Sequence, residues 1–202
     1  MGELFGKACA VVSDKALSGR SSKSFYDEGA WTPVRTALGA GDYVLIQFGH
    51  NDEKSDEPTL YTDPQTTYKQ YLTKYISDAR AKQAVPVLLT SINRNSWSGT
   101  KLNDTHGAYP PAVRELAAAL DVDLIDMTAL TKQYFERLGP SETNKLFMNL
   151  AVGQFPNYPN GNSDNTHLQE IGARKIGQLA MFDAYGQRLT LASLLQAIPS
   201  AP

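Results

Sequence analysis

Residues 43–54 read YVLIQFGHNDEK, and this stretch decides the fold that the sequence predicts. Its first part, residues 43–48, is short and apolar, as strands buried on both faces are. Gly49 follows and permits a tight exit from the strand, and three polar residues (His-Asn-Asp) come directly after it. The stretch therefore predicts a buried parallel strand whose carboxyl end carries polar side chains.

Three further runs have the same character, and amphipathic segments alternate with them. The apolar runs are residues 8–13 (ACAVVS), 85–91 (VPVLLTS) and 122–127 (VDLIDM). The helical patterns cover residues 67–83, 111–120, 127–138 and 166–185. Strands that alternate with helices pair in parallel through right-handed crossovers. The sequence therefore predicts the α/β class, as a three-layer α/β/α sandwich around a parallel sheet.

The length and composition fit one ordinary globular domain. The chain has 202 residues and a formal net charge of −2, without repeats, low-complexity tracts or a composition break that would mark a linker. We therefore expect a single domain over residues 1–202. The slight negative charge and the lack of a basic stripe argue against nucleic acid as a partner.

Other composition signals concern redox chemistry, metals and membranes. The one cysteine, Cys9, lies in an apolar run, which predicts a buried thiol and argues against a disulfide framework or a cysteine-type metal site. No apolar stretch approaches the ~20 residues needed to span a membrane, and the N-terminus does not read as a signal peptide. As it stands the chain is expected in the cytoplasm, unless a leader precedes Met1.

Ligand sites in parallel sheets lie beyond the carboxyl ends of the strands, so the loops there are the place for functional side chains. Asn51 follows one strand, and its side-chain N–H suits a developing oxyanion. The alternative is that Asn and Asp after a strand simply make an Asx turn. Gly19, in the loop ALSGRSSKSF (16–25), can present a backbone N–H to the same oxyanion, although Gly-Ser loops are common.

A third polar stretch, SDNTHL (163–168), precedes the last predicted helix. Asp164 and His167 are three residues apart, which suits a carboxylate that orients an imidazole for general-base work. The alternative is a plain helix entry, in which Thr166 with Gln169 fits a capping box. An Asp–His pair and two oxyanion donors at one sheet edge together make most of an ester-hydrolase site.

These blocks resemble the SGNH (GDSL-type) hydrolases, and most of all the rhamnogalacturonan acetylesterase branch, which removes acetyl groups from pectic polysaccharide. The resemblance covers almost the whole chain, and the stretches that carry it are ALSGRSSKSF, VLIQFGHND, DTHGAYPPAVRELAAAL, DMTALTKQYFERLG and DNTHLQEIGARKIGQL. It implies a flavodoxin-like fold with five parallel strands in the order 2-1-3-4-5. It also implies that no metal or other cofactor is required.

The resemblance implies roles for four residues. Gly19 matches the second-block glycine that donates its backbone N–H to the oxyanion, and Asn51 matches the third-block asparagine that donates its side-chain amide. Asp164 and His167 match the last-block pair, in which the histidine is the general base and the aspartate fixes its tautomer. The first block has no match: in the family it ends in Gly-Asp-Ser and carries the nucleophile, and this chain contains no Gly-Asp-Ser.

The resemblance therefore implies a chain that is N-terminally truncated relative to the family and lacks its first strand. In the family order, the first strand lies between the strands that match residues 8–13 and 43–48. Its removal leaves backbone N–H and C=O groups on both of these strands to be paired. Three solutions are open. The two flanking strands pair directly, a second copy supplies a strand in a homodimer or higher oligomer, or the chain is a fragment completed elsewhere. We expect direct closure or dimerisation.

The sequence does not identify the nucleophile. Ser13 ends the first predicted strand and is followed by Asp14, while Ser21 and Ser22 lie beside the predicted oxyanion glycine, so all three serines are candidates. A water molecule activated by the Asp–His pair is the alternative. It is expected to be slower, because no covalent intermediate forms.

Two functions of different classes follow from these residues. The first is a carboxylic ester hydrolase that deacetylates carbohydrate or small acyl esters through an Asp–His-assisted serine. The second is a catalytically inactive family member or fragment that binds carbohydrate or a partner chain. A flavodoxin-like ligand-binding domain is a third, but no glycine-rich phosphate loop supports it. The related family is often secreted, in contrast to the cytoplasmic expectation above.

Overall fold

The computed structural model describes residues 10–195, so the predicted buried thiol of Cys9 lies outside the described residues. The chain divides into two compact units. One unit, called here the sheet unit, comprises residues 13–91 and 106–126. The other, called the C-terminal unit, comprises residues 1–12, 92–105 and 127–202.

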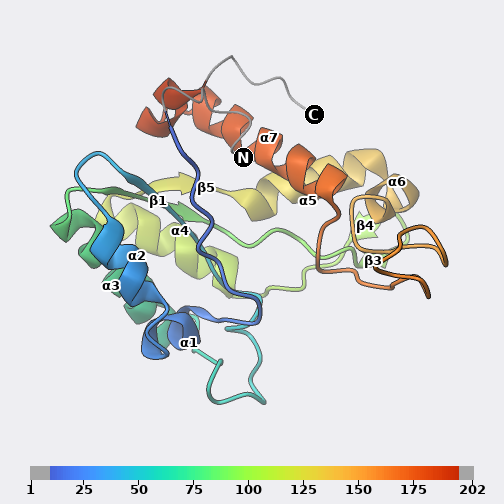
Figure 1. Ribbon diagram of the computed structural model, residues 1–202, viewed down its shortest axis with the longest axis horizontal. Helices are drawn as coiled ribbons and strands as arrows, with labels where there is room; N and C mark the ends of the chain where they lie inside the picture. The colour runs from blue at the N-terminus through green and yellow to red at the C-terminus, as the bar shows by residue number, and fades with distance from the viewer. Residues whose placement is uncertain (1–9, 196–202) are drawn as a thin grey trace. The chain divides into compact units, whose positions relative to one another are not determined.

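A parallel sheet of three strands forms the centre of the sheet unit (Figure 1). In the sheet order β1-β2-β5, the strands are β1 (Tyr43–Gln47), β2 (Val85–Leu89) and β5 (Asp123–Ile125). Tyr43 lies opposite Val85, and Val87 lies opposite Asp123. All three strands lie within the runs predicted from the sequence, and the mixed α/β class is confirmed. The central strand β2 is the most buried of the three, as a strand covered on both faces should be.

The strand predicted over residues 8–13 is wrong for its described part. Residues 10–13 form no strand, and Val11 and Val12 are exposed. Apolar composition alone does not hold a strand, because a strand needs ladder hydrogen bonds to a neighbour. Within residues 10–195, β1 pairs only with β2, so the expected direct closure of the sheet against residues 10–13 is also wrong. Dimerisation stays a prediction.

Four helices belong to the sheet unit: α1 (Ser22–Asp27), α2 (Trp31–Ala37), α3 (Thr67–Ala81) and α4 (Tyr109–Leu120). Helix α3 packs against β2, and α4 packs against β2 and β5. The apolar stripe of α3 is buried as its helical spacing predicts, through Tyr68, Leu72, Tyr75, Ile76 and Ala79. Helix α4 carries prolines in its first turn, where their missing N–H groups cost no helical hydrogen bond.

An aromatic cluster connects the first three helices to the end of β1. Tyr75 on α3 is its centre, with its ring centroid 5.0 Å from that of Trp31, 5.3 Å from that of Phe48 and 5.5 Å from that of Tyr26. The Tyr75 hydroxyl also donates a hydrogen bond of 2.7 Å to the carbonyl of Ser22. The cluster therefore fixes the loop before α1 and the loop after β1, which carry the two predicted oxyanion donors.

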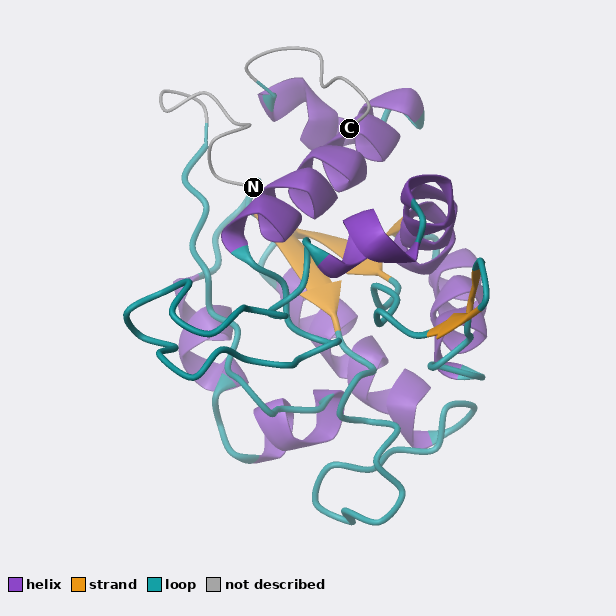
Figure 2. Ribbon diagram, turned by 90° about the vertical axis from the view of Figure 1, so that its right-hand side faces the viewer, coloured by secondary structure: helices purple, strands orange, loops and turns teal. Residues whose placement is uncertain are grey.

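The C-terminal unit consists mainly of helices joined by long loops (Figure 2). Its elements are β3 (Trp97–Ser98), β4 (Lys101–Leu102), α5 (Met127–Leu138), α6 (Pro140–Asn144), α7 (Glu170–Gly186) and the 3₁₀ helix η2 (Thr190–Leu194). Strands β3 and β4 form a short antiparallel pair. Helix α5 packs against α6, α7 and β4, and the ring of its buried Phe135 contacts that of Phe147 at 5.6 Å.

The last helix begins later than the sequence predicts. Helix α7 starts at Glu170 instead of Thr166, and the predicted capping box of Thr166 with Gln169 does not form. The Gln169 side chain instead donates to the carbonyls of Lys145 and Phe147. Residues 164–167 form a turn of their own before the helix, and this turn holds the Asp–His pair.

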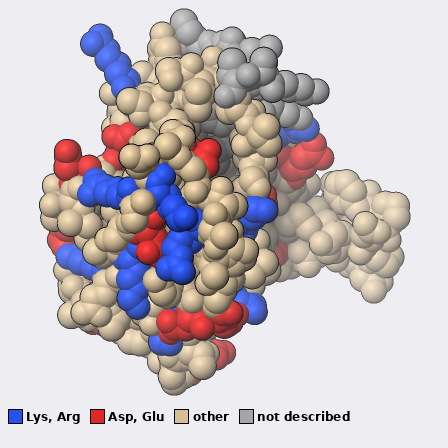
Figure 3. All heavy atoms as spheres, turned by 60° about the vertical axis from the view of Figure 1, so that its left-hand side comes forward, with Lys and Arg blue, Asp and Glu red and all other residues tan. Residues whose placement is uncertain are grey.

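Within the described residues, none of the helices is long and apolar enough to cross a membrane. Both signs of charge occur together on the face drawn in Figure 3, where Lys and Arg side chains lie among Asp and Glu. Charged side chains of the described residues form ion pairs, such as Arg20 with Glu28 at 2.7 Å and Lys23 with Asp27 at 2.8 Å.

Candidate active site

The Asp–His turn of the C-terminal unit is organised by one carboxylate. Asp164 Oδ1 accepts hydrogen bonds from the backbone N–H groups of Thr166, at 2.8 Å, and His167, at 2.9 Å. Asp164 Oδ2 lies 2.7 Å from His167 Nδ1. Because an ionised carboxylate only accepts hydrogen bonds, this contact places the proton on Nδ1 and leaves Nε2 with its lone pair. The His167 side chain is 71% exposed, so Nε2 is accessible to a substrate.

The pKa of Asp164 is held below its usual value. Partial burial acts to raise this pKa, but the backbone N–H groups of His167 and Thr166 and the His167 imidazole stabilise the charged carboxylate and outweigh burial. The carboxylate therefore stays ionised near neutral pH, and it holds the imidazole in one orientation.

The lowered pKa of Asp164 gives a pH-dependent contribution to stability. A carboxyl whose pKa is lower in the folded state stabilises the fold above its unfolded pKa of ~3.9, and this contribution is lost as pH falls through the folded pKa. We expect Asp164→Asn to destabilise the protein near neutral pH, and the difference from wild type to shrink as pH falls from about 5 to about 2, through the lowered pKa of Asp164. Urea denaturation at each pH measures it. A difference that stays constant over this range would contradict the assignment.

Four asparagine side chains form a closed ring beside this turn. The Asn95 amide donates to Asn144 Oδ1 at 3.0 Å and to Asn165 Oδ1 at 2.9 Å. The Asn149 amide donates to the same two oxygens, in both cases at 2.8 Å. Asn149 Oδ1 in turn accepts the backbone N–H of Asp164 at 2.9 Å. The four-asparagine ring therefore fixes the start of the Asp–His turn. No sequence pattern predicts these contacts between distant asparagines.

The predicted oxyanion donors Gly19 and Asn51 lie in neighbouring loops of the sheet unit. Asn51 Nδ2 donates a hydrogen bond of 3.1 Å to the carbonyl of Arg20, the residue after Gly19. An amide nitrogen carries two N–H groups, so this contact leaves one of them for an oxyanion. Gly19 is exposed and has a φ of 75°, a conformation that L side chains rarely adopt. The loop geometry therefore requires glycine at this position.

A buried carboxylate, Asp52, joins these two loops. It is 0% exposed and accepts the backbone N–H of Ser22 at 3.0 Å and that of Gly49 at 3.0 Å. The hydroxyls of Ser22 and Thr62 also donate to it, that of Thr62 at 2.9 Å. Burial raises the pKa of Asp52, and the four donors act in the opposite direction without reversing the shift. Asp52 thus connects the start of α1 to the end of β1.

The three candidate nucleophiles have different surroundings. Ser21 is 0% exposed and caps α1, where its hydroxyl accepts the backbone N–H of Ser24 at 3.1 Å. Ser22 is 0% exposed, and its hydroxyl donates to Asp52. These contacts favour structural roles for both hydroxyls. Ser13 is exposed and lies outside any helix or strand.

Two histidines of the sheet unit, His50 and His106, are in contact although they are far apart in the sequence. No sequence pattern predicts this contact. Their rings meet edge to face with centroids 4.5 Å apart. His106 is buried, and its Nδ1 lies 3.0 Å from Glu53 Oε2. The loop of His106 is therefore held by His50 and Glu53, which lie on either side of Asn51 and Asp52 in the sequence.

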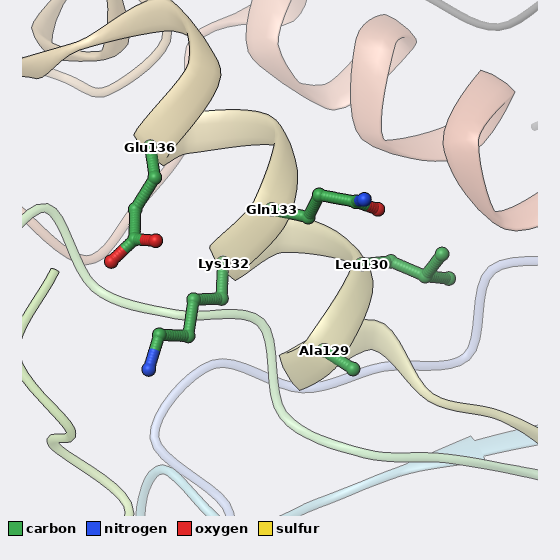
Figure 4. Close-up of a pocket in the computed structure, with 5 residues that line it drawn as sticks. All are labelled: Ala129, Leu130, Lys132, Gln133 and Glu136. Atoms are coloured by element: carbon green, nitrogen blue, oxygen red, sulfur yellow. The ribbon is translucent and has the colours of Figure 1, made fainter.

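In the described part of the chain, the polar residues above belong neither to a cluster of metal ligands nor to the hollow found on α5. Residues 10–195 contain no group of three or more His, Cys, Asp or Glu side chains that could hold a metal ion. A hollow of about 470 Å³ on α5 is lined by Ala129, Leu130, Lys132, Gln133 and Glu136. Lys132 and Glu136 point to one side of the helix and Leu130 and Gln133 to the other (Figure 4). This hollow contains none of the predicted site residues.

Comparison with known proteins gives a family match. The model of the GDSL-like lipase/acylhydrolase family matches residues 1–175. The rhamnogalacturonan acetylesterase RhgT of Bacillus subtilis is 40% identical over 179 residues, which is 88% of this chain and 75% of RhgT. The rhamnogalacturonan acetylesterase of Emericella nidulans is 30% identical, over 82% of this chain and 69% of that protein.

Two solved structures share the fold. The crystal structure of YxiM from Bacillus subtilis superposes with a TM-score of 0.79 at 23% identity, over 93% of this chain. The chain spans about half of that structure, or 49% of its length. A catalytic mutant of Axe2, an acetylxylan esterase from Geobacillus stearothermophilus, superposes with a TM-score of 0.54 at 16% identity, covering 82% of this chain and 68% of Axe2.

Proposed function

The chain belongs to the GDSL-like lipase/acylhydrolase (SGNH) family, and from this membership we propose that it is a carboxylic ester hydrolase that removes acetyl groups from carbohydrate. The names of its relatives support this substrate class, since RhgT and the Emericella nidulans protein are both rhamnogalacturonan acetylesterases. The observation that carries the proposal is the 2.7 Å contact between Asp164 Oδ2 and His167 Nδ1, inside the part of the chain that matches the family.

In the proposed reaction His167 is the general base. Its Nε2 takes the proton from the attacking hydroxyl, whose oxygen forms a bond to the carbonyl carbon of the ester. The tetrahedral intermediate then collapses, and the same Nε2 returns the proton to the departing sugar oxygen. A water molecule, activated in the same way, hydrolyses the acyl intermediate to acetate. Asp164 stabilises the imidazolium that forms in each half of the reaction.

Gly19 and Asn51 are the proposed oxyanion donors. The backbone N–H of Gly19 and the second N–H of the Asn51 amide would donate to the oxygen on which negative charge develops. Each donor of this kind contributes about 2.7–4 kcal/mol to an acyl-transfer transition state. The hydrogen bond from Asn51 to the carbonyl of Arg20 supports the pairing, because it holds both loops together before substrate binds.

The attacking hydroxyl comes from one of two sources in this proposal. One is a serine, with Ser13, Ser21 and Ser22 as the candidates, and the other is a water molecule that attacks the ester directly. A fluorophosphonate probe distinguishes them, because it labels an activated serine covalently. Mass spectrometry of the labelled protein names the serine. Turnover without labelling at any of the three positions would reject all three candidates.

Hydrolysis of p-nitrophenyl acetate tests the function itself. We expect release of p-nitrophenolate well above the rate of a heat-denatured sample at the same concentration, and release of acetate from acetylated rhamnogalacturonan. Surface lysines that are acylated without turnover would give a single burst and then stop, so the steady-state rate is the quantity to measure. A steady-state rate equal to that of the denatured sample would overturn the proposal.

One observation favours a second function, which is carbohydrate binding without catalysis. Two of the three candidate nucleophiles, Ser21 and Ser22, are 0% exposed, and their hydroxyls already form hydrogen bonds with Ser24 and Asp52. If this reading is correct, isothermal titration calorimetry shows binding of acetylated rhamnogalacturonan oligosaccharides by a protein that releases no acetate. Acetate release at a steady rate would exclude it.

A further inference from the structure

An antiparallel ribbon carries the Asp–His turn at its base. Residues 147–168, called here the ribbon, fold back on themselves through three bridges that pair Phe147 with Leu168, Leu150 with Asn162 and Phe155 with Tyr158. At the base, the backbone N–H of Met148 also donates to the carbonyl of His167 at 2.8 Å. The proposed general base and the tip formed by residues 155–158 therefore belong to one continuous piece of structure.

The middle of the ribbon is well fixed. Leu150 and Asn162 exchange two backbone hydrogen bonds of 2.9 and 3.0 Å, and Asn162 Nδ2 donates to the carbonyl of Met148 at 2.7 Å. Gly161 has a φ of 74°, and a Cβ atom there would lie 2.6 Å from the carbonyl oxygen of Leu150. Only glycine permits this close approach, so the two arms have a defined register below the tip.

Two aromatic side chains are exposed at the tip. Phe155 is 42% exposed and Tyr158 is 40% exposed, and all residues from 151 to 160 are exposed. Side chains of residues paired across an antiparallel bridge project from the same face, so both aromatic side chains leave the backbone on one face of the ribbon. Single exposed apolar residues are common and need no explanation, but a pair on a projecting turn indicates a binding surface.

The tip is also free of charge. No Asp, Glu, Lys or Arg occurs between Lys145 and Asp164, and the polar side chains at the tip are uncharged, such as those of Asn157 and Asn160. A sugar ring has the matching chemistry, because its C–H face packs on an aromatic ring while its hydroxyls bond to amide groups. Two aromatic rings expose at most ~500 Å², less than the ~800 Å² that each partner buries in a stable protein complex.

We propose that Phe155 and Tyr158 form a subsite for sugar rings of the polysaccharide chain, remote from the acetyl group that is removed. This inference rests on the proposed function, since it adds a second contact for the same substrate. Phe155 comes five positions after Leu150, so the tip lies no more than ~18 Å beyond the fixed middle of the ribbon. A chain of several sugars reaches from the ester to the tip, whereas p-nitrophenyl acetate does not.

Kinetics with two substrates test the subsite. The double variant Phe155→Ala/Tyr158→Ala is expected to raise KM for acetylated rhamnogalacturonan oligosaccharides about tenfold, because two stacking contacts are lost. Its kcat/KM for p-nitrophenyl acetate should stay within about twofold of wild type, because that substrate does not reach the tip. The single variant Phe155→Tyr keeps an aromatic ring at position 155, so its KM for the oligosaccharides should equal that of wild type.

A matched control lies on α7, where Phe182 is 40% exposed. Phe182→Ala removes an equally exposed aromatic ring from the same unit and should leave both substrates unaffected. Equal KM values for wild type and the double variant, or equal losses on both substrates, would overturn the subsite. The tip carries no charge, so salt should not change the effect of the double variant. The ratio of its KM for the oligosaccharides to that of wild type should be the same at about 0.05 and about 0.5 M salt.

Calorimetry separates failure of the subsite from failure of the proposed function. The titration uses the deacetylated oligosaccharide, which requires no turnover, with the wild type, the double variant and Phe182→Ala. Weaker binding by the double variant alone supports the subsite, even if no ester is hydrolysed by any of the three. Equal binding by all three proteins overturns it, whether or not p-nitrophenyl acetate is a substrate.

Discussion

His167→Ala is expected to lower kcat for p-nitrophenyl acetate by about 10²–10⁴-fold, which is the range that a positioned general base contributes. The reason is local: Asp164 holds Nδ1, and Nε2 is the nitrogen left to take the proton. KM should change much less, because the imidazole accepts a proton in the transition state and contributes little to binding of the ester. Steady-state kinetics of the purified variant measure both quantities.

Two controls make the His167→Ala result interpretable. The side chain is 71% exposed, so the free energy of unfolding should fall by no more than about 1 kcal/mol, and thermal melting checks this. Lys145→Ala removes another exposed side chain of the C-terminal unit and should keep full activity. Added imidazole should restore part of the lost rate. Activity of His167→Ala equal to that of wild type would exclude His167 as the base.

The second large effect is expected for Asp52→Ala. The change leaves the backbone N–H groups of Ser22 and Gly49 buried without their acceptor. Each such group costs about 1–3 kcal/mol, so the free energy of unfolding should fall by about 2–6 kcal/mol. Guanidinium or urea denaturation measures the change, and the loops that carry Gly19 and Asn51 should become more mobile with it.

Asp56→Ala is the matched control, because Asp56 lies in the same loop and is exposed. It should change the free energy of unfolding by no more than about 0.5 kcal/mol. Asp52→Asn keeps the shape of the side chain but turns an N–H₂ group toward N–H donors, so it should destabilise as well. Wild-type stability of Asp52→Ala would show that its carboxylate does not hold the two loops together.

Strands and helices were predictable where the sequence pattern of a single segment determines them. A prediction was wrong where the segment also needs a neighbouring strand. Residues 43–48 are mostly apolar and are followed by Gly49, and residues 43–47 form β1 as expected. The run at residues 8–13 looks the same in the sequence, yet Val11 and Val12 are exposed, because composition does not say whether a neighbouring strand is present. Helix α7 starts at Glu170 because Gln169 binds carbonyls that no helix pattern reveals.

The same distinction applies to the site. Asp164 and His167 are three residues apart, so their contact was readable from spacing alone. The partners of Asp52 include Ser22, 30 positions away, and Asn95 reaches Asn165 across 70 positions. Such contacts depend on the complete packing of a unit, and a single sequence offers no signal for them. His50 and His106 are a further example, because their ring contact also joins distant segments.

The four-asparagine ring joins segments that are far apart in the chain, so it has to offset the entropy lost when they are held together. Closing the 70-residue loop between Asn95 and Asn165 costs about 4 kcal/mol of chain entropy, taken as (3/2)RT ln n. Asn95 makes three hydrogen bonds across this loop, two from its side-chain amide and one from its backbone N–H to the carbonyl of Asn165 at 2.8 Å. At about 0.5–1.5 kcal/mol each, they offset a large part of that cost. Residues 92–105 are thereby held to the turn of His167 without a covalent bond. The ring differs from a disulfide in one respect: it constrains only the folded chain, so residues 92–105 are released as soon as the four side chains separate.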